Sequence, residues 1–435
     1  MLILRGKFTR QIIMRPVPTE LISKSLPEPA PTHQIRALEA FKSPAYRYFF
    51  GGQIISLTGT WVQNVAQQIV VYQMTGSELA LGLVACAQGL PAFILAPVSG
   101  VIAERFSRRR ILIGTQITMM LMALIMALLH FSGVLQIWHV MLLSVGLGVA
   151  NALDAPARLA FISEMVGKEA LPSGIVLNSI MFNAARIVGP AFGGLVLRWV
   201  GPSWCFLFNG LSFLAVIAGL ILMHLTPLPH KRATTSVITQ FREGLSFSRF
   251  HPEIAPLLIL SALSSTFGMT FSILIPSFAD QVLKNTIDGT SALLTVQGLG
   301  AFAGALFIGR ITGLGFRGRV LAFGATVGPA SVILMSFTQS FGLVAVWMGL
   351  AGFAFVCQYV LMNTLLQTVV PDEFRGRVMS LYSVTFFGLT PFGSLLIGAM
   401  GQVIGTTTTM LVFGAIGLTG SLIVLKRAPQ VMRMP

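Results

Sequence analysis

The sequence predicts an all-α integral membrane protein, with twelve transmembrane helices arranged in two pseudo-symmetric six-helix bundles. Three observations predict this fold: an apolar composition, apolar stretches of membrane length, and basic residues confined to alternate loops. Hydrophobic residues make up 54% of the chain and charged residues only 10%, whereas charged residues supply roughly a quarter of a globular protein. The chain is therefore expected to lie mostly within a lipid bilayer.

Apolar stretches of about twenty residues recur along nearly the whole chain, and each is long enough to cross roughly 30 Å of hydrocarbon. They are too continuously apolar for the strands of a membrane barrel, which alternate with a period of two. The twelve expected spans are approximately 48–73, 80–103, 111–131, 136–157, 174–198, 204–226, 256–282, 291–311, 320–338, 341–365, 378–404 and 407–425.

Basic residues distinguish the two sides of the predicted membrane. They occur in 1–47, 105–110, at Arg158 and Lys168, in 231–249, 310–319, at Arg375 and Arg377, and from Lys426 onward, whereas the opposite loops carry only Arg198 and Lys284. Since loops rich in Lys and Arg stay in the cytoplasm, both ends of the chain are predicted to be cytoplasmic. The basic loops lack the interleaved aromatic residues that stack on bases, so nucleic acid is not an expected partner despite the net charge of +15.

The expected domain organisation follows from the spans. It comprises a basic, partly Pro-rich cytoplasmic arm (1–42), a first six-helix bundle (43–226), a cytoplasmic linker (227–255), a second bundle (256–426) and a short cytoplasmic tail (427–435). The arm has no apolar region followed by a small-residue cleavage site, so no secretory signal peptide is expected. An organellar transit peptide and a start at Met14 remain open alternatives.

Several classes of chemistry are not expected. Cys86, Cys205 and Cys357 fall in different spans without paired spacing, which is typical of small core residues and of neither a disulfide framework nor a metal site. The chain contains no phosphate-binding G-x-x-x-x-G-K-[ST] loop, no HExxH and no G-x-S-x-G, so neither ATP hydrolysis nor another enzymatic activity is predicted. No cofactor is expected.

The two halves of the chain repeat one another. The loop Gly100–Arg110 has a degraded counterpart at Gly309–Arg319, about 209 residues later, and GPAFGG at Gly189–Gly194 is echoed at Thr390–Gly398. Similar offsets at two places indicate duplication of a six-helix unit. Parallel repeats of this kind are typical of secondary transporters, in which two bundles rock about a site near the midplane.

The loop GVIAERFSRRRIL, from Gly100 to Leu112, lies between the second and third expected spans. It resembles the loop between helices 2 and 3 of the major facilitator superfamily, whose usual form is G-x-L-A-D-R-x-G-R-R. Glu104 replaces the usual Asp and Ser107 replaces a Gly. The resemblance implies the major facilitator fold.

The fifth span reads NSIMFNAARIVGPAFGG. Pro190 removes a backbone hydrogen bond there, and Gly189, Gly193 and Gly194 permit a bend and a close helix neighbour. The stretch resembles the G-x-x-x-G-P-x-x-G-G motif of the superfamily's proton-coupled exporters, with Ala185 in place of the first glycine. The alternative is a kinked helix whose small residues only serve packing.

Other segments, among them NALDAPARLAFISEMV and NTLLQTVVPDEFRGRVMSLY, are similar to the branch of the superfamily that includes the enterobactin exporter and macrolide-efflux-like proteins. The resemblance runs from about Ser43 to Arg427. It implies a monomeric, alternating-access exporter of amphipathic or anionic small molecules, of the drug or siderophore class, in the plasma (bacterial inner) membrane and driven by proton antiport. The alternatives are an importer or lipid flippase on the same fold, or a non-transporting sensor.

Arg186 is the leading candidate for substrate binding. It falls near the middle of the fifth span, where a charge costs about 2.5–3.5 kcal/mol on the insertion scale, so it should face a cavity or a partner. Asn183 shares its helix face. We expect both to line a cavity, with Arg186 as an anchor for an anionic or hydrogen-bonding substrate. Arg186 could instead pair with Asp154, which also has Arg158 four residues away.

Further candidates come from polar faces of other spans. The first span carries polar residues at three-to-four spacing, from which Trp61, Asn64 and Gln68 are predicted to contact substrate; the alternative is hydrogen bonding between helices. The candidates in the second half are Gln297, Gln358, Tyr359, Asn363 and Tyr382.

The basic loop between the second and third spans is predicted to act as a conformational latch. Its members are Gly100, Glu104, Arg105, Arg108 and Arg109. The resemblance implies that this loop pairs with the other half when the cytoplasmic side is closed. The alternative is that its charges only set the topology.

Proton coupling has little support in the residues themselves. A proton relay needs a titratable group near the transport path, and the acids noted near the spans are Asp154 and Asp280. Asp154 is therefore the candidate for the titrating group.

Overall fold

The computed structural model describes residues 38–223, 237–249, 251–311 and 315–434, and within these ranges the regular structure is entirely helical. The elements are η2 (Glu39–Lys42), α1 (Pro44–Thr75), α2 (Glu78–Arg105), α3 (Arg108–Phe131), α4 (Ile137–Trp199), α5 (Pro202–Leu222), α6 (Val237–Arg249), α7 (Ile254–Leu263), η3 (Ser264–Gly268), η4 (Met269–Leu274), α8 (Ile275–Gln281), α9 (Thr286–Ile311), α10 (Arg317–Ser336), α11 (Phe341–Val369), α12 (Asp372–Ser383), η5 (Val384–Gly388), α13 (Thr390–Ile404), α14 (Thr406–Arg427) and η6 (Pro429–Arg433).

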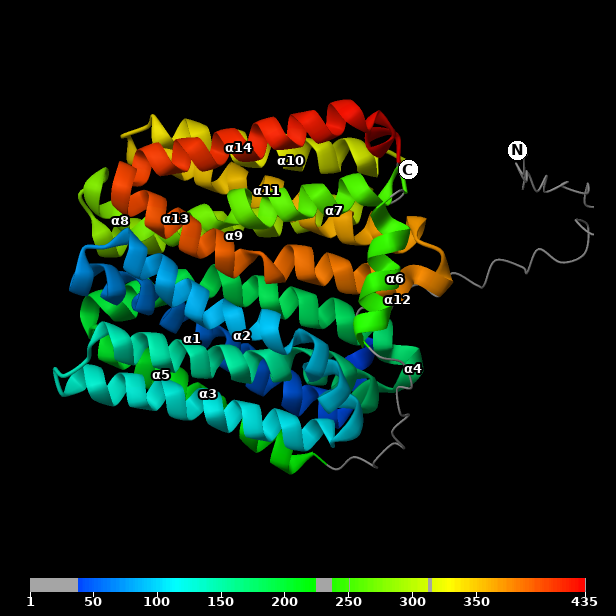
Figure 1. The fold of residues 1–435 in the computed structure, drawn as a ribbon. Coiled ribbons are helices and arrows are strands. Elements are labelled where there is room, and N and C mark those ends of the chain that lie inside the picture. The colour runs from blue at the N-terminus through cyan, green and yellow to red at the C-terminus, as the bar shows by residue number, and fades with distance from the viewer. Residues whose placement is uncertain (1–37, 224–236, 250, 312–314, 435) are drawn as a thin grey trace, which may run out of the picture. The chain divides into compact units, whose positions relative to one another are not determined.

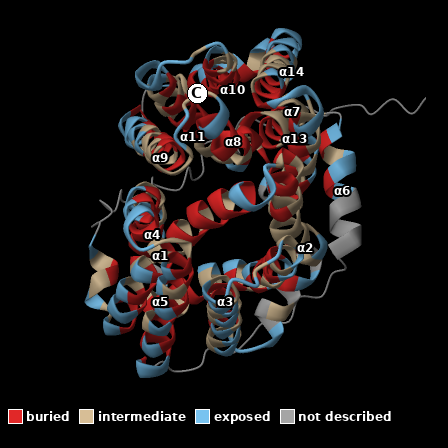
Figure 2. Cartoon of the chain, turned by 90° about the vertical axis from the view of Figure 1, so that its left-hand side faces the viewer, coloured by how far each residue is buried: buried red, intermediate tan, exposed pale blue. Residues whose placement is uncertain are grey.

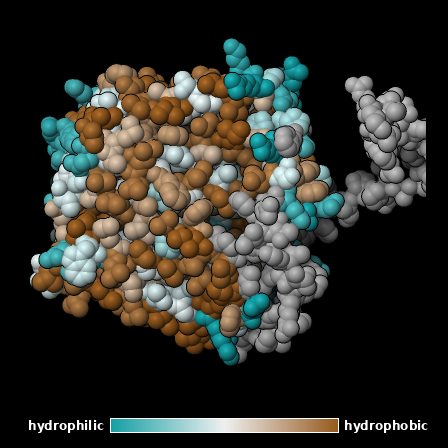
Figure 3. Space-filling view, viewed as in Figure 1, coloured by the Kyte–Doolittle hydropathy of each residue, from teal (hydrophilic) through white to brown (hydrophobic). Residues whose placement is uncertain are grey.

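The predicted transmembrane fold is confirmed. Within the described ranges, 11 helical segments are long and apolar enough to cross a membrane. Together with α1, which has 32 residues and several buried polar side chains, they account for the twelve expected spans. The face in Figure 3 is mostly hydrophobic across its middle, and hydrophilic side chains gather toward its two ends, as expected where acyl chains surround the protein.

The fourth and fifth spans form one helical element, although the sequence predicted a break between 157 and 174. Both spans extend into the predicted loop and meet at Gly167, whose φ of 73° and ψ of 176° interrupt the helix. A left-handed φ of this kind strains any residue with a Cβ. The helical periodicity of the short segment between the two apolar stretches was not recognised in the sequence.

The helices pack as two groups. In the first group α1 packs against α4 and α5, and in the second α11 packs against α9 and α10. The groups meet where α2 lies beside α13 and α4 lies beside α9 (Figure 2). We call the end of the bundle that holds residues 38–43 and 428–434 the termini end, and the opposite end the far end; the termini end is on the right in Figure 1.

Small residues allow the two groups to touch. A Cβ on Gly82 of α2 would lie 2.5 Å from the Ser394 carbonyl oxygen of α13, and a Cβ on Gly298 of α9 would lie 2.9 Å from the Arg186 carbonyl oxygen of α4. Such close backbone approach is the usual role of small residues between membrane helices. The inter-group contact therefore depends on glycine at these positions.

The helix α6, within the predicted linker, packs on α12 at the termini end. Arg377 lies 3.1 Å from Glu243 in an ion pair, and the rings of Phe247 and Phe374 stack with centroids 4.2 Å apart. The helix α6 thus has a defined position on the second group of helices.

Candidate functional site

Arg186 lies on α4, where this helix meets α1 and α9. Its guanidinium carbon is 5.9 Å from the ring centroid of Trp61 on α1. Gly189, one turn later on α4, leaves the space that the Trp61 side chain occupies, because a Cβ there would collide with the tryptophan Cβ. Local sequence therefore brings one cation and one aromatic face together at the junction of the two groups.

The Arg186 guanidinium has no hydrogen-bond acceptor and no ion-pair partner among the described residues. The expected alternative, a pair with Asp154, does not form. An uncompensated charge at mid-membrane depth is unfavourable unless a cavity or ligand solvates it. Since an arginine over an indole face attracts further π-systems and anions, the pair is chemically suited to an aromatic or anionic ligand.

The polar side chains of α1 divide into two sets. Gln63 accepts a hydrogen bond from Asn209 at 2.7 Å, and Gln67 donates to Ser144 at 3.0 Å. These two glutamines hold α1 to its own group of helices, as expected if the polar face of α1 serves hydrogen bonding between helices. A polar face on one helix is thus partly structural.

Trp61, Asn64 and Gln68 form the second set and are only partly buried. The side-chain oxygen of Gln68 is buried without a hydrogen-bond partner. On α4, the predicted neighbour Asn183 donates to the Ser179 carbonyl at 2.8 Å, which leaves its amide oxygen available. These residues stay candidates for substrate contact.

In the second half, Tyr359, Tyr382 and Phe386 form an aromatic cluster. The Tyr359 ring lies 4.6 Å from that of Phe386 and 6.5 Å from that of Tyr382. Gln358 is 1% exposed, and neither its oxygen nor its nitrogen has a hydrogen-bond partner. It lines a small cavity with Ser261 and Tyr359.

Two π-helical segments, η3 and η5, adjoin this cavity. Segments of this type occur frequently at functional sites because they disturb the regular backbone hydrogen bonding of a helix. They are tied together by Ser265, whose hydroxyl donates to the Thr385 carbonyl at 2.8 Å. Neither segment was predicted from the sequence.

The remaining two candidates of the second half do not line this cavity. Gln297 is 8% exposed on α9, next to the Gly298 contact with α4. Asn363 accepts a hydrogen bond from Gln367 one turn further along α11. Among the described residues, no polar contact joins either of them to Arg186. The candidates therefore form separate groups in this structure and not one continuous site.

Asp154 is surrounded by structural partners. It is 1% exposed, accepts hydrogen bonds from Thr115 and Gln116 at 2.9 Å each, and lies 3.6 Å from the Arg158 Nε atom. This arrangement closes the α3–α4 contact. A role for Asp154 in proton coupling stays a prediction.

We expect Asp154→Asn to lower stability, because it leaves Arg158 without its negative partner. Removing one member of a buried pair costs about 3–5 kcal/mol, so the apparent melting temperature in detergent should fall clearly. Asp154→Asn with Arg158→Gln should recover part of the loss. A variant that melts like the wild type and loses proton-dependent transport would instead favour the coupling role.

The latch residues that can be described bond within the first group of helices. Arg108 lies 2.7 Å from Glu164, Arg109 donates to the Ile221 carbonyl at 2.8 Å, and Arg105 is exposed. Gly100 has no side chain to form a pair, and the Glu104 side chain lies outside the described part of the structure. Pairing of this loop with the other half therefore stays a prediction for another conformation.

The glycines and proline of the fifth span, Gly189, Pro190, Gly193 and Gly194, form a helix-bend motif that contributes to packing in this structure. The helix α4 continues through Pro190. A Cβ on Gly193 would lie 3.2 Å from Val62 Cα on α1, and one on Gly194 would lie 2.5 Å from Ser291 Cβ on α9. The motif thus holds α4 against helices of both groups.

Sequence reasoning missed one buried acid, Glu78. The second span was expected to begin at residue 80, whereas α2 begins at Glu78, after Ser77 caps the helix by accepting from the Ala80 amide at 3.2 Å. Glu78 is 4% exposed and contacts residues of the second group. The available signal was a serine cap followed by an acid, which indicates a helix start.

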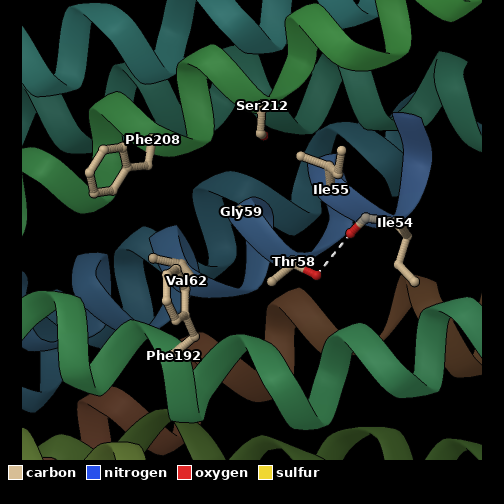
Figure 4. Close-up of a pocket in the computed structure, with 8 residues that line it drawn as sticks. All are labelled: Ile54, Ile55, Thr58, Gly59, Val62, Phe192, Phe208 and Ser212. Carbon is tan, nitrogen blue, oxygen red and sulfur yellow. Dashed lines mark hydrogen bonds between the residues drawn. The ribbon is translucent and has the colours of Figure 1, made fainter. Parts of the chain in front are cut away.

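A separate groove lies between α1, α4 and α5 (Figure 4). Its volume is about 320 Å³, and it is lined by Ile54, Ile55, Thr58, Gly59, Val62, Phe192, Phe208 and Ser212. Ile55 and Phe192 are exposed on the outer surface, and the Thr58 hydroxyl is satisfied by the Ile54 carbonyl. This groove therefore faces lipid and contains none of the predicted substrate contacts.

Two packed groups of membrane helices, which meet at a cation without an ion-pair partner among the described residues, are typical of a secondary transporter. The chain belongs to the transmembrane secretion effector family of the major facilitator superfamily, whose sequence profile matches residues 35–433. Relatives include the uncharacterised MFS-type transporter YfiS of Bacillus subtilis, 25% identical over 86% of this chain and 90% of that protein. The enterobactin exporter EntS of Citrobacter koseri is 27% identical over 85% of this chain and 88% of that protein.

Solved structures support the same fold. A POT family transporter in complex with 5-aminolevulinic acid aligns with a TM-score of 0.71 at 12% identity, over 89% of this chain and 97% of that one. A bacterial homologue of the lysosomal transporter Spinster, in an inward-facing and unoccupied conformation, aligns with a TM-score of 0.69 at 15% identity, over 89% and 98%. The major facilitator fold expected from the sequence is confirmed.

Proposed function

We propose that this transporter exports a small anionic or amphipathic molecule with aromatic character, by alternating access across the cytoplasmic membrane. The observation that carries the proposal is the Arg186 guanidinium, which lies 5.9 Å from the Trp61 ring centroid without an acceptor among the described residues. An anionic aromatic ligand would satisfy the charge and stack on the indole in one pose. The name of the EntS relatives adds siderophores to the candidate substrates.

The orientation in this proposal follows from charge. Basic side chains gather at the termini end, so that end is assigned to the cytoplasm by the positive-inside rule. At the far end, Ser77 donates to Gln402 at 2.6 Å and Arg198 pairs with Asp288 at 3.2 Å, which joins the two groups of helices. The conformation is thus interpreted as closed to the outside and facing the cytoplasm.

The two moving bodies are proposed to be residues 43–226 and 256–426, connected by the linker 227–255. The packing of α1 on α5 and of α11 on α9 supports each body as a unit. Proton antiport is the proposed driving force and the monomer the proposed functional state. Export needs an energy source, and the sequence has no nucleotide-binding loop.

The direct test is accumulation of fluorescent drugs, macrolides and a catecholate siderophore in an efflux-deficient bacterium that expresses the chain. We expect lower accumulation of at least one compound, and we expect a protonophore to abolish the difference. Cells with an empty vector give the baseline, and membrane fractions verify expression. Unchanged accumulation of every compound would argue against export of these classes and favour the importer, flippase or sensor alternatives.

Trp61 should contribute to affinity through its ring face. We expect Trp61→Ala to raise KM about 10-fold, since a stacked aromatic pair contributes about 0.5–1.5 kcal/mol beyond its buried area, and Trp61→Phe to raise it about threefold at most. The measurement is concentration-dependent transport into inverted vesicles. Equal KM values for wild type and Trp61→Ala would remove Trp61 from the site.

A further inference from the structure

Glu78 lies where α2 meets α8 and α14 at the far end, and three oxygen atoms converge there. Glu78 Oε1 is 2.6 Å from Ser277 Oγ and 3.0 Å from Thr406 Oγ1, and these two hydroxyl oxygens are 2.6 Å from each other. Gln281 donates from its amide nitrogen to the same carboxyl oxygen at 2.8 Å. Glu78 belongs to the first group of helices and the other three residues to the second.

The triangle of oxygens has a definite proton requirement. Each of its three sides has hydrogen-bond length, so three protons are needed for every side to be a hydrogen bond. The hydroxyl groups of Ser277 and Thr406 supply one proton each. If Glu78 is ionised, only two protons are available, and one pair of oxygen atoms lies at hydrogen-bond distance without a hydrogen between them. A proton on Oε1 removes this problem. Glu78 then donates to Ser277, Ser277 donates to Thr406, and Thr406 donates to Glu78.

The charged groups near this end do not compensate a carboxylate at Glu78. On α1 the nearest titratable group is the Tyr72 hydroxyl, which accepts from Gln281 at 3.3 Å. Asp280 on α8 accepts from Thr286, and Arg198 pairs with Asp288. Lys284, in the turn after α8, forms no ion pair with Glu78 or with another acid among the described residues. The groups that contact Glu78 within the described part of the chain are neutral, and a buried ion without a counter-charge is costly.

We propose that Glu78 is a proton-binding site that closes the far end: its carboxyl is protonated while α2 contacts α8 and α14, and it ionises when these helices separate. Opening the far end exposes the carboxyl to water, where a glutamate is ionised at neutral pH. Closing the end again requires a proton from the same side. The role of the far end as the outward side rests on the proposed function.

The expected consequence is a conformational equilibrium that depends on pH. Because the closed state binds one proton more than the open state, acid favours the closed state by mass action. In the proposed export cycle, a proton from outside would thus assist the return of the empty transporter. Substrate is not needed for this step.

The test measures the far end directly, without substrate. Met74 on α1 and Val403 on α13 are exposed, so Met74→Cys and Val403→Cys can carry spin labels in a background without the three native cysteines. Distances are measured by double electron–electron resonance in lipid nanodiscs at pH 8.5 and 5.5. We expect the closed fraction to rise about threefold or more at pH 5.5.

Variants assign this response to Glu78. Glu78→Gln should be mostly closed at both pH values, since the amide supplies a hydrogen to the ring without ionising. Asp280→Asn, an exposed acid on α8 that accepts from Thr286 within the second group, should keep the wild-type response. Thr406→Val keeps the side-chain size and should lower the closed fraction at pH 5.5 about threefold, which tests the ring even if Glu78→Gln does not insert.

Three outcomes would overturn the proposal: a closed fraction that does not change with pH, a Glu78→Gln variant that responds to pH like the wild type, or a Glu78→Gln variant that is open at both values. The last result would mean that the ionised carboxylate holds the end closed. Efflux of drugs or siderophores is measured in a separate experiment that does not depend on these outcomes. Failure of this inference can therefore be distinguished from failure of the proposed function.

Discussion

Replacing Arg186 by Gln is expected to lower export about 100-fold while the protein becomes no less stable. An anion bonded to a buried arginine loses about 2–5 kcal/mol when that arginine is removed, and each 1.4 kcal/mol corresponds to a tenfold change in binding. The free protein loses the contact of Arg186 with Trp61, worth about 0.5–2 kcal/mol, but also an uncompensated charge within the membrane, which costs about 2.5–3.5 kcal/mol on the insertion scale. Function and stability should therefore change in opposite directions.

This pair of effects separates a binding role from a structural one. Transport by Arg186→Gln is measured in inverted vesicles, and the apparent melting temperature is measured in detergent without substrate. Arg186→Lys keeps the charge without the planar guanidinium and should retain part of the activity. Arg110, which is exposed at the termini end, supplies the matched control, since Arg110→Gln should leave both quantities near wild type.

A lower melting temperature with normal transport would mean that Arg186 has a structural partner in another conformation. Normal transport with an unchanged melting temperature would remove the residue from the proposed site altogether. Either result would favour the other candidates for substrate contact, such as Asn64 and Gln68 on α1.

The sequence predicted the features that depend on local composition. Span length is a direct requirement of bilayer thickness, so the twelve expected spans match the helices. Arg186 was recognisable because charged residues are rare within membrane spans and usually mark a functional site. The helix α6 was hidden because the linker has no apolar stretch, and its docking depends on Glu243 and Phe247 meeting α12.

Contacts between distant parts of the chain were not predictable from one sequence. Glu78 meets Ser277 and Thr406, which are 199 and 328 residues away, and no local pattern encodes that meeting. The polar face of α1 gives a second example. Gln67 and Gln68 are adjacent in sequence, yet Gln67 is buried and donates to Ser144 within its own group, whereas Gln68 is only partly buried; only the positions of the neighbouring helices separate these roles.

Adding one methyl group at Gly398 is expected to open the far end and to reduce export at least 10-fold. A Cβ on Gly398 would lie 2.6 Å from the Glu78 carbonyl oxygen and 2.8 Å from Gly82 Cα. All of these atoms are backbone, so the clash can be relieved only if α2 and α13 move apart. Overpacking of this kind costs about 1–3 kcal/mol, which is comparable with the few kcal/mol that separate two functional conformations.

The same spin-label pair at Met74 and Val403 measures the effect of Gly398→Ala on the far end, and vesicle transport measures its cost. Gly114→Ala on α3 is the control, because no atom lies within 4 Å of the added Cβ and alanine favours a helix over glycine. We expect the open fraction to rise severalfold for Gly398→Ala alone. If Gly398→Ala stays closed and transports normally, the α2–α13 contact does not limit opening of the far end, and the Glu78 ring would have to hold that end closed without help from close helix packing.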